Sequence, residues 1–590
     1  MHVIATAGHV DHGKSTLIRA LTGMEPDRWA EEQRRGMTID LGYAWTTLAD
    51  GETLAFVDVP GHERFVTNML AGVGPVPAVL FVVAADGGWG AQSAEHLAAL
   101  DALGVRHGVL VITRSDLGDA ERAGAQARAQ LVGTSLQGIE TVAVSAPAGT
   151  GLAELRAALG RLVAALPRPV DQRTRLWVDR VFSIRGAGTV VTGTLTGGVI
   201  RLGEELQVHP GGAIVRVRKI ETLKQVVEHS PAVARVALNL RGTKVADIHR
   251  GDALTGPGQW LDVDVMDVRL ATGAVPVTGL VLHLGAAAVP VRVRRLGADI
   301  ARLTLARPLP ASVGERVVLR DPGGRRIMVA ATVLDVLPPP LHRRGSARLR
   351  ALELAEVSGG PDPAAEIRRR GAVRRSQLAR AGVPIGAGQD LDQVVVQGDW
   401  LVAGLRWQEW GRALLEGVEQ WARRHPLAPG MPRQSAVAQL ELPDAALLDA
   451  LVRESSLLVI DEGGIHRRDH VKVLPPPLQD ALAQLVQRLA FAPFAAPEIA
   501  VLQAAGLTEA VLAVAVGEGR LVRIAAGIYL GADAPVEAVR WLRELDQPFT
   551  MAAARQVLRT TRRVAVPLLE FLDRAGLTVR VDSQLRRIHS

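Results

Sequence analysis

The sequence contains no cysteine among its 590 residues, which excludes disulfide bonds and thiolate metal sites. Its longest apolar run, near residues 78–85, is much shorter than the ~20 residues needed to cross a bilayer. The amino-terminal apolar stretch runs directly into a glycine-rich loop, unlike the pattern of a signal peptide. We therefore expect a cytoplasmic protein that has no membrane partner.

Lysine is scarce as well, and it occurs only at positions 14, 219, 224, 244 and 472. Arginine carries nearly all of the positive charge, and the formal net charge of +7 favours a polyanionic partner without proving one, because the base composition of a gene can also enrich arginine. A chain of this length should form several domains, since single cores rarely exceed ~250–300 residues. The 60 glycines and 33 prolines indicate many turns and plentiful strands.

The most specific motif is G-H-V-D-H-G-K-S at residues 8–15. A strand is predicted over residues 3–7 and a helix over 16–21, which is the strand–loop–helix setting of a phosphate-binding loop. The glycines let backbone N–H groups surround phosphate oxygens, and the helix N-terminus adds partial positive charge. Lys14 can reach the β- and γ-phosphates, and Ser15 can ligate magnesium. The sequence therefore predicts binding of a nucleoside triphosphate.

Two further polar segments complete a nucleotide switch. D-V-P-G-H-E at residues 58–63 ends a predicted strand, where an acidic residue can hold magnesium through water and the Gly61 N–H can sense the γ-phosphate. R-G-M-T-I-D at residues 35–40 lies in a polar loop that contains Thr38. Strands predicted over residues 78–84 and 109–113, with helical stretches between them, indicate a parallel sheet covered on both faces.

Together these motifs resemble the GTPase domain of the translational GTPases over residues 1–168. The resemblance implies GTP/GDP and Mg²⁺ as cofactors, and ribosome-stimulated GTP hydrolysis as the activity. It implies that His62 orients the attacking water, with Val10 and Ile39 as an apolar gate, and that the metal is bound by Ser15 and Thr38 and supported through water by Asp58. The residues expected to bind GTP in these motifs are Asp11, His12, Gly13, Lys14, Ser15, Thr16 and Gly61.

The segment expected to read the base departs from the family pattern. Family members usually have Asn-Lys-x-Asp, whereas this chain has Thr113, Arg114, a serine and then Asp116. Asp116 can still accept from the guanine N1–H and amino groups, which adenine cannot match. Ser145 and Ala146 lie at the expected distance for a second base-side loop. We therefore expect GTP rather than ATP, while the arginine in place of lysine bears on how tightly the nucleotide is held.

Residues 170–258 and 259–338 change to short β-rich runs separated by glycine, which indicates two antiparallel barrels. Residues 179–193 resemble the signature of the second domain of elongation factor Tu and its relatives. Residues 281–293 and 318–326 resemble the selenocysteine-specific elongation factors, a narrower family.

In that family a small pocket on the second domain receives the selenocysteinyl group, and Asp179, Arg180 and Arg235 match its motif positions. A selenol is ionised at neutral pH, so a basic pocket would favour it over the neutral hydroxyl of serine. The alternative is a plain surface ion pair between Arg180 and Asp179, and the sequence does not separate the two interpretations.

Four similar units follow at intervals of roughly 60 residues, a spacing typical of repeats. Each unit reads as helices followed by a short β-hairpin, the pattern of a winged helix. Tandem winged helices resemble the carboxy-terminal extension of bacterial members of the same family. The expected fold class is multidomain: an α/β P-loop GTPase domain, two antiparallel β-barrels and four tandem winged-helix (α+β) domains. The expected winged-helix boundaries are 350–405, 406–474, 475–532 and 533–590.

Positive charge concentrates in the last unit. Between Arg555 and Arg587 the chain has eight arginines against three acidic residues. Such a surface suits an RNA hairpin, which is read through backbone contacts and unstacked loop bases. The alternative is a solvated arginine face. The candidate RNA-binding residues are Arg555, Arg559, Arg562, Arg563, Arg586 and Arg587.

The sequence thus predicts a monomeric, GTP-dependent carrier of selenocysteinyl-tRNA that acts on the ribosome at UGA codons. Its tail would bind a hairpin in the selenoprotein mRNA. The alternatives are another translational-type GTPase, either an elongation factor Tu-like carrier or the GTPase subunit of sulfate adenylyltransferase, and a nucleotide-switched winged-helix nucleic-acid binder.

Overall fold

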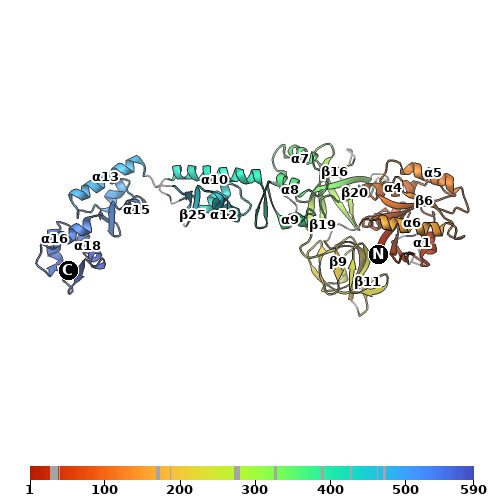
Figure 1. Cartoon of the computed structure of the whole chain (residues 1–590), viewed down its shortest axis with the longest axis horizontal. Coiled ribbons are helices and arrows are strands. Elements are labelled where there is room, and N and C mark those ends of the chain that lie inside the picture. Colours follow the sequence, from red (N-terminus) through yellow and green to blue (C-terminus); the bar gives the residue numbers. More distant parts are fainter. Residues whose placement is uncertain are drawn as a thin grey trace. The chain divides into compact units, whose positions relative to one another are not determined.

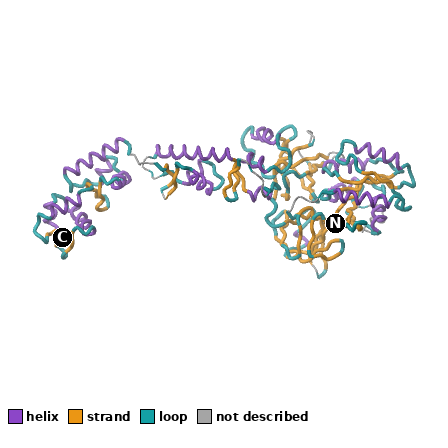
Figure 2. Tube along the Cα trace, viewed as in Figure 1, coloured by secondary structure: helices purple, strands orange, loops and turns teal. Residues whose placement is uncertain are grey.

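The computed structural model describes residues 1–26, 38, 40–167, 173–186, 188–271, 279–323, 328–386, 391, 393–425, 428, 430–461, 463–469 and 474–589. The chain divides into two compact units, one of Met1–Val394 with Gly398–Leu401 and one of Val395–Gln397 with Val402–Ser590. Figures 1 and 2 show strands dominating the first unit and helices the second. No helix of the described residues has the length and apolarity needed to cross a membrane.

The first domain is built on one sheet, in which the described residues form six strands in the order β2-β3-β1-β4-β5-β6. Strand β2 pairs antiparallel with β3, and the other neighbouring pairs are parallel. The strands are β1 (His2–Ala7), β2 (Gly42–Thr47), β3 (Thr53–Asp58), β4 (Ala78–Ala84), β5 (His107–Thr113) and β6 (Glu140–Ala143).

Helices cover both faces of this sheet, as the sequence predicted (Figure 1). Alternate side chains of a strand point to opposite faces, so Val3 enters one core and Ile4 the other. The core that contains Ile4 packs under α1 and α6, and the other packs under α3, α4 and α5. The helices are α1 (Lys14–Thr22), α3 (Val66–Val73), α4 (Ala91–Leu103), α5 (Ala120–Leu131) and α6 (Leu152–Ala165).

The sheet topology brings three motifs together. Strand β1 pairs in parallel with β3, and it is connected to β5 through β4, again by parallel pairing. The carboxyl ends of β1, β3 and β5 therefore lie at one edge of the sheet. The loop at residues 8–13 follows β1, residues 59–62 follow β3, and residues 114–116 follow β5. Ligands of open parallel sheets bind outside this edge, and the candidate nucleotide residues therefore converge there.

The second domain is a closed antiparallel barrel of six strands in the order β10-β15-β7-β8-β14-β11, with β10 pairing back to β11. This closure confirms the barrel predicted from the glycine-separated runs. Strand β12 extends the sheet beside β11, and β9 pairs with β13. The strands are β7 (Arg175–Ile184), β8 (Gly188–Gly197), β9 (Val199–Arg201), β10 (Glu205–His209), β11 (Ile214–Thr222), β12 (Gln225–Val227), β13 (His229–Pro231), β14 (Ala234–Arg241) and β15 (Ala253–Thr255).

The third domain is a second closed barrel, in the order β16-β19-β18-β17-β20-β21. Residues 324–326 of the family-like stretch noted above lie outside the described residues. The strands are β16 (Asp262–Leu270), β17 (Leu280–Leu284), β18 (Ala287–Arg295), β19 (Ile300–Pro310), β20 (Arg316–Arg320) and β21 (Met328–Asp335).

A buried ionic cluster joins this barrel to helices α7 (Ser346–Ala355) and α8 (Pro363–Arg370). Asp335 is fully buried and contacts the guanidiniums of Arg350, Arg369 and Arg370, while Arg350 also binds Asp267 at 2.8 Å. Burial alone would raise the pKa of Asp335, but the three guanidiniums lower it to about 2. Because removing one partner would leave a buried unpaired charge, the cluster fixes both helices on the barrel.

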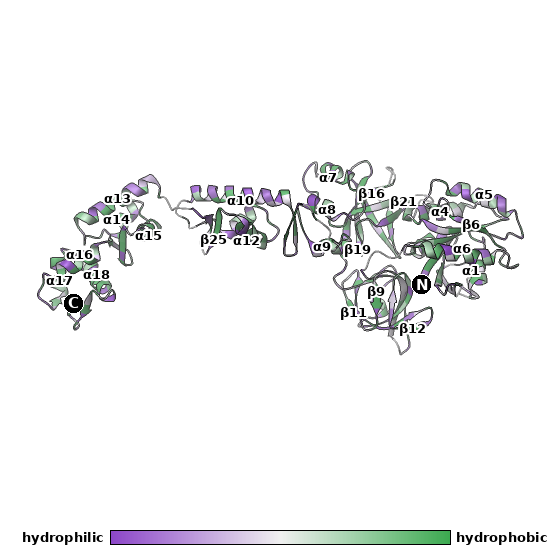
Figure 3. Ribbon diagram, in the orientation of Figure 1, coloured by the Kyte–Doolittle hydropathy of each residue, from purple (hydrophilic) through white to green (hydrophobic). Residues whose placement is uncertain are grey.

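After the barrels, helices followed by two short strands recur four times within the described residues. Figure 3 shows hydrophobic and hydrophilic residues alternating along α10 and α13, whose apolar faces pack inward. The remaining helices are α9 (Arg375–Arg380), α10 (Gly404–Arg424), α11 (Arg433–Gln439), α12 (Ala445–Glu454), α13 (Pro476–Phe491), α14 (Ile499–Ala504), α15 (Glu509–Gly517), α16 (Ala534–Leu542), α17 (Met551–Val557) and α18 (Arg562–Arg574).

In units two to four the helices are followed by an antiparallel hairpin, as predicted from the sequence. In the last unit, α18 begins at Arg562, so this arginine and Arg563 lie in the first turn of the helix. The strands are β22 (Ala372–Arg374), β23 (Val394–Gln397), β24 (Trp400–Ala403), β25 (Leu458–Asp461), β26 (Gly464–Arg467), β27 (Leu521–Ala525), β28 (Ile528–Gly531), β29 (Phe549–Thr550), β30 (Thr578–Arg580) and β31 (Leu585–Ile588).

Candidate functional site

The loop between β1 and α1 has the backbone of a phosphate cradle. Gly8 has φ +132°, and a Cβ at this position would lie 2.1 Å from the Val82 carbonyl oxygen, so only glycine fits. Gly13, at φ +78°, precedes the first residue of α1, Lys14. The Lys14 ammonium donates to the carbonyls of Gly8 and His9, at 3.1 and 2.7 Å. The lysine therefore lies along the loop, where its charge adds to that of the helix N-terminus.

Three oxygen-bearing side chains meet beside this loop. The Ser15 hydroxyl donates to Asp58 Oδ2 at 2.7 Å and lies 3.1 Å from the Thr38 hydroxyl. Asp58 is fully buried, and its other oxygen accepts from Thr6 at 2.7 Å. Hydroxyl and carboxylate oxygens are the ligands that magnesium prefers, so the three predicted residues are placed together in a set that fits the ion.

Gly61 brings the next loop against the phosphate cradle. A Cβ at Gly61 would lie 2.6 Å from both Lys14 Nζ and the Val10 backbone nitrogen, so its backbone touches the loop that would hold the γ-phosphate. His62 follows, half-buried, and its Nδ1 accepts from the Arg64 N–H at 3.2 Å. Of the predicted apolar gate, Val10 is half-buried and Ile39 lies outside the described residues.

Two polar residues of α4 support the loop and were not predicted from the sequence. The Gly8 N–H donates to His96 Nδ1 at 3.1 Å, and the Val10 N–H donates to Gln92 Oε1 at 2.9 Å. Burial lowers the pKa of His96 to about 3, so the ring stays neutral and remains an acceptor. Gln92 and His96 are four residues apart, a spacing that places both on one helix face, and this is the signal that could have revealed them.

The base-side loops also lie together. The Ser115 N–H donates to the Val144 carbonyl at 3.3 Å, which sets the 113–116 segment beside Ser145 and Ala146. Ser145 is buried and Asp116 is exposed. Thr16, predicted to bind GTP, is exposed in the first turn of α1.

Arg114 links three segments at this edge. Its guanidinium donates to the Asp11 carbonyl at 2.5 Å and to Asp86 at 3.1 Å, while the adjacent Thr113 hydroxyl donates to the His12 carbonyl at 2.7 Å. Burial is the main cause that lowers the pKa of His12 to about 4. The base-side loop is thus tied to the phosphate loop by side chains, and Asp86, which the sequence reasoning missed, gives the guanidinium a second anchor.

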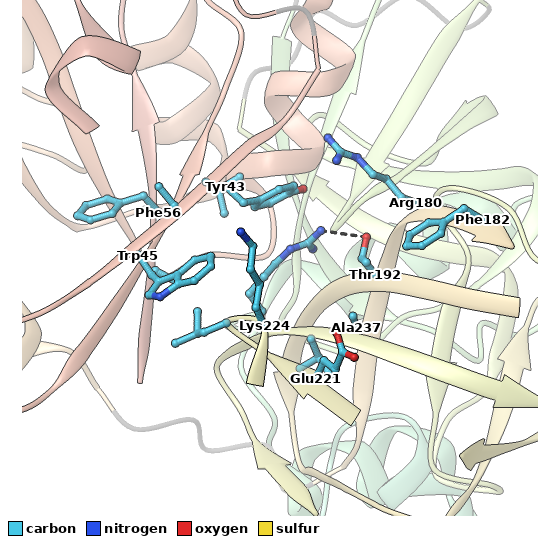
Figure 4. A pocket seen from close by; sticks show the side chains of 15 residues that line it. Tyr43, Trp45, Phe56, Arg180, Phe182, Thr192, Glu221, Lys224 and Ala237 are labelled. Atoms are coloured by element: carbon cyan, nitrogen blue, oxygen red, sulfur yellow. Dashed lines mark hydrogen bonds between the residues drawn. The ribbon is translucent and has the colours of Figure 1, made fainter. Parts of the chain in front are cut away.

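A cavity of about 250 Å³ lies between β2 and β3 of the first domain and the outer face of the first barrel. Figure 4 shows Tyr43 and Trp45 on one side of it, and Arg180, Phe182, Thr192 and Glu221 on the other. Arg180 and Arg235 both line the cavity, and a third cation, Lys224, projects toward the Trp45 ring at 5.5 Å.

The three predicted pocket residues do lie close together, but their pairing differs from the alternative considered above. Asp179 pairs with Arg235 rather than with Arg180, and the Arg235 guanidinium also donates to Thr192 at 3.2 Å. Burial lowers the pKa of Arg235, but the Asp179 carboxylate offsets this and leaves it raised. Arg180 instead binds Asp40 at 3.0 Å and the Leu41 carbonyl at 2.5 Å.

The structure separates the predicted RNA-binding arginines by their surroundings. Arg586 is 7% exposed and binds Asp573 at 2.9 Å, so it holds the last module together. Arg563 is exposed but donates to the Ala496 and Pro497 carbonyls. The remaining four are exposed and, in the part of the chain that the structure describes, make no side-chain hydrogen bond or ion pair: Arg555, Arg559, Arg562 and Arg587.

Comparison with known proteins gives three matching families along the chain. Residues 1–165 match the elongation factor Tu GTP binding domain, residues 274–340 match the selenocysteine-specific elongation factor beta-barrel domain, and residues 540–586 match the winged helix of elongation factor SelB.

Two relatives that align over nearly the full length of the chain have the same name. The chain is 31% identical to a selenocysteine-specific elongation factor of Desulfomicrobium baculatum, over 99% of each protein. It is 33% identical to that of Escherichia coli (strain K12), over 98% of this chain and 97% of the relative. A crystal structure of a bacterial selenocysteine-specific elongation factor, 26% identical, covers 100% of both chains with a TM-score of 0.73.

The Arg114 contacts predict an effect on nucleotide release. Replacing Arg114 with alanine removes the links to Asp11 and Asp86, and we expect GDP to dissociate about three- to tenfold faster, the effect of a ~1 kcal/mol interaction. Stopped-flow release of a fluorescent GDP analogue measures this rate. Asp86→Ala in the Arg114→Ala background should add little, because the two residues act through one contact.

Arg128→Ala is the matched control, since Arg128 makes an exposed ion pair with Glu121 on α5. Equal release rates for the Arg114 and Arg128 variants would contradict the proposed link.

Proposed function

The chain belongs to the family of selenocysteine-specific elongation factors, and from this membership we propose that it carries selenocysteinyl-tRNA to the ribosome, in a GTP-dependent reaction, at UGA codons. The observation that carries the proposal is the cationic cavity between the GTP-binding domain and the first barrel. This cavity would receive the selenocysteinyl group.

The charges around the cavity favour an anionic side chain. Arg235 is held by Asp179, so it contributes less free positive charge than its position suggests. Arg180 shares Asp40 with Arg250, and Lys224 makes no hydrogen bond or ion pair among the described residues. Arg180 and Lys224 are therefore the cations we assign to the selenolate, since a charge-assisted contact discriminates against neutral serine.

The nucleotide site would control this cavity through a short segment. Thr38 reaches Ser15 of the phosphate loop, whereas Asp40 and the Leu41 carbonyl bind Arg180 of the barrel. Magnesium, when bound, would neutralise phosphate charge, with Ser15 and Thr38 as its ligands and Asp58 accepting from Ser15. A displacement of Thr38 would therefore also shift Asp40, two residues later, and so change the contact that holds Arg180 of the cavity.

His62 is the residue we assign to hydrolysis. Its neighbour Gly61 touches Lys14 and the phosphate loop, so His62 follows the backbone that would sense the γ-phosphate. An imidazole at this point can orient a water molecule and hold its proton. We propose that the ribosome stimulates this step.

The tail would bind the selenoprotein mRNA hairpin through the last module. Four exposed arginines make no side-chain hydrogen bond or ion pair within the described part of the chain, and we assign these to RNA phosphates. They lie on α17, α18, β31 and the turn between the two helices. Arg562 also lies in the first turn of α18, where backbone N–H groups favour an anion. Arg563 and Arg586 would act indirectly, by holding the module in shape.

Competition between selenocysteinyl-tRNA and seryl-tRNA, in the presence of a GTP analogue, tests the proposed carrier function. The unmodified protein should prefer the selenocysteinyl form, and Arg180→Ala or Lys224→Ala should reduce that preference by about tenfold, because each removes a charge-assisted contact. Arg216→Ala is the matched control, since Arg216 lies on the same barrel, binds Glu205 and does not line the cavity. Equal affinity of the unmodified protein for both tRNAs would refute the proposal.

Replacing His62 with alanine should leave GTP binding intact and lower ribosome-stimulated hydrolysis by about 100-fold or more, the usual contribution of a positioned proton acceptor. Single-turnover phosphate release, with and without ribosomes, measures the step. Unchanged stimulation by ribosomes would remove His62 from the mechanism.

Arg562→Ala with Arg587→Ala should weaken binding of the mRNA hairpin and reduce the slope of log affinity against log salt by about 1.5 to 2, since two phosphate contacts are lost. Arg574→Ala with Arg580→Ala is the charge-matched control, because both arginines donate to nearby carbonyls. If the two double variants weaken binding equally, Arg562 and Arg587 contribute only to the overall positive charge, and their assignment to individual phosphates is wrong.

A further inference from the structure

A buried threonine outside the three nucleotide motifs lies beside the phosphate loop. Thr6 is the fifth residue of β1, two residues before Gly8, and it is fully buried. The parallel register places Ala5 opposite Val57, so Thr6 and Asp58 come next on the two strands. Side chains opposite each other in a parallel pair lie on the same face of the sheet. Thr6 and Asp58 therefore lie together on the face that α1 covers.

The hydrogen bonds of Thr6 have a fixed direction. Its hydroxyl accepts from the Val59 N–H at 3.1 Å and donates to Asp58 Oδ1 at 2.7 Å. A hydroxyl has one proton and two lone pairs, so the bond from the Val59 backbone occupies a lone pair and leaves the proton for the carboxylate. One oxygen of Asp58 is thus held in place from β1.

The other oxygen of Asp58 faces the phosphate loop. Oδ2 accepts from the Ser15 hydroxyl at 2.7 Å, and Ser15 lies 3.1 Å from the Thr38 hydroxyl. Since Ser15 donates its only proton to Asp58, its lone pairs are left for Thr38 and for a metal ion. The orientation of Asp58 therefore sets the direction in which the Ser15 lone pairs point.

We propose that Thr6 is a positioning residue for the magnesium ion that accompanies the bound nucleotide. It acts through two other residues: the Thr6 hydroxyl fixes the carboxylate of Asp58, and the carboxylate fixes the Ser15 hydroxyl that would bind the ion. Groups that are hydrogen-bonded to the holders of a metal contribute strongly to metal affinity. The inference rests on the magnesium site of the proposed function and extends that site to a residue of β1.

Burial is the reason why a single hydroxyl has this effect. Asp58 is fully buried, so bulk water does not replace a donor that it loses. A buried carboxylate that loses a hydrogen bond is destabilised and shifts toward its other donors. Without the Thr6 proton, Asp58 would turn relative to Ser15 and would no longer hold the serine hydroxyl in one orientation.

Magnesium-dependent release of GDP tests this role in the full chain. The ion bridges the protein and the phosphates, so it should slow the dissociation of a fluorescent GDP analogue, which is measured over a range of Mg²⁺ concentrations and in excess EDTA. Thr6→Val keeps the shape of the side chain and removes the hydroxyl. Thr6→Ala removes the hydroxyl without placing a methyl group against the carboxylate, and Thr6→Ser keeps the hydroxyl.

We expect Thr6→Val and Thr6→Ala to raise the Mg²⁺ concentration at the midpoint of this titration about tenfold, while the release rate in EDTA changes by less than about twofold. Thr6→Ser should keep the midpoint of the unmodified protein. The separation identifies a positioning role, because a general loosening of the nucleotide site would also speed release in EDTA.

The inference is overturned by an unchanged midpoint in both variants without the hydroxyl, by an equal shift in Thr6→Ser, or by a release rate in EDTA that rises as much as the midpoint. Thr134→Val is the matched control. It removes a half-buried hydroxyl of the same domain that donates to the Leu131 carbonyl at 2.8 Å, after α5. Its midpoint should equal that of the unmodified protein, and a tenfold shift in this control would also overturn the inference.

The same titration separates the role of Thr6 from the function on which it rests. GDP release from the unmodified protein that does not respond to Mg²⁺ would refute the magnesium site, and the role of Thr6 with it. Mg²⁺-dependent release that the Thr6 variants leave unaltered would refute the role of Thr6 alone. Neither tRNA nor ribosomes take part, so the outcome is independent of the selenocysteinyl-tRNA competition.

Discussion

The structure depends on one short segment that is bonded at both of its ends. The Thr38 hydroxyl meets Ser15 beside the phosphate loop, and two residues later Asp40 receives the Arg180 guanidinium from the barrel. A carboxylate shared by two arginines is a strong and directional contact. Because both bonds lie on the same few residues, this segment links the phosphate loop directly to the cavity between the first domain and the first barrel.

The cavity contains a largely buried cation, Arg235, whose charge is balanced by an acid. Burying Arg235 is costly unless a partner is supplied, and Asp179 supplies it within a bidentate pair. That pairing lowers the net charge that Arg235 offers to a ligand, so under the proposed function discrimination would fall to Arg180, whose acid is shared with Arg250, and to Lys224. Tyr43 and Trp45 close the other side with aromatic faces, against which Arg235 and Lys224 lie at 3.9 and 5.5 Å.

RNA recognition would depend on the exposed arginines of the last winged-helix module. Among the described residues, Arg587 makes no side-chain hydrogen bond or ion pair, whereas Arg586 on the same strand binds Asp573. Contacts to phosphates carry little sequence information, so such surfaces set affinity and orientation. Specificity would come from the aminoacyl cavity and from loop bases of the hairpin.

The sequence alone determined the phosphate loop, the doubly covered sheet and the barrels, because these follow from local order: residues 8–15 sit between one strand and one helix, and short runs with glycine turns form hairpins. It could not decide which charges pair. Arg180 finds Asp40 and not the adjacent Asp179, and Arg586 turns inward to Asp573, because partners far apart in the chain are selected only when strands take their register and domains pack.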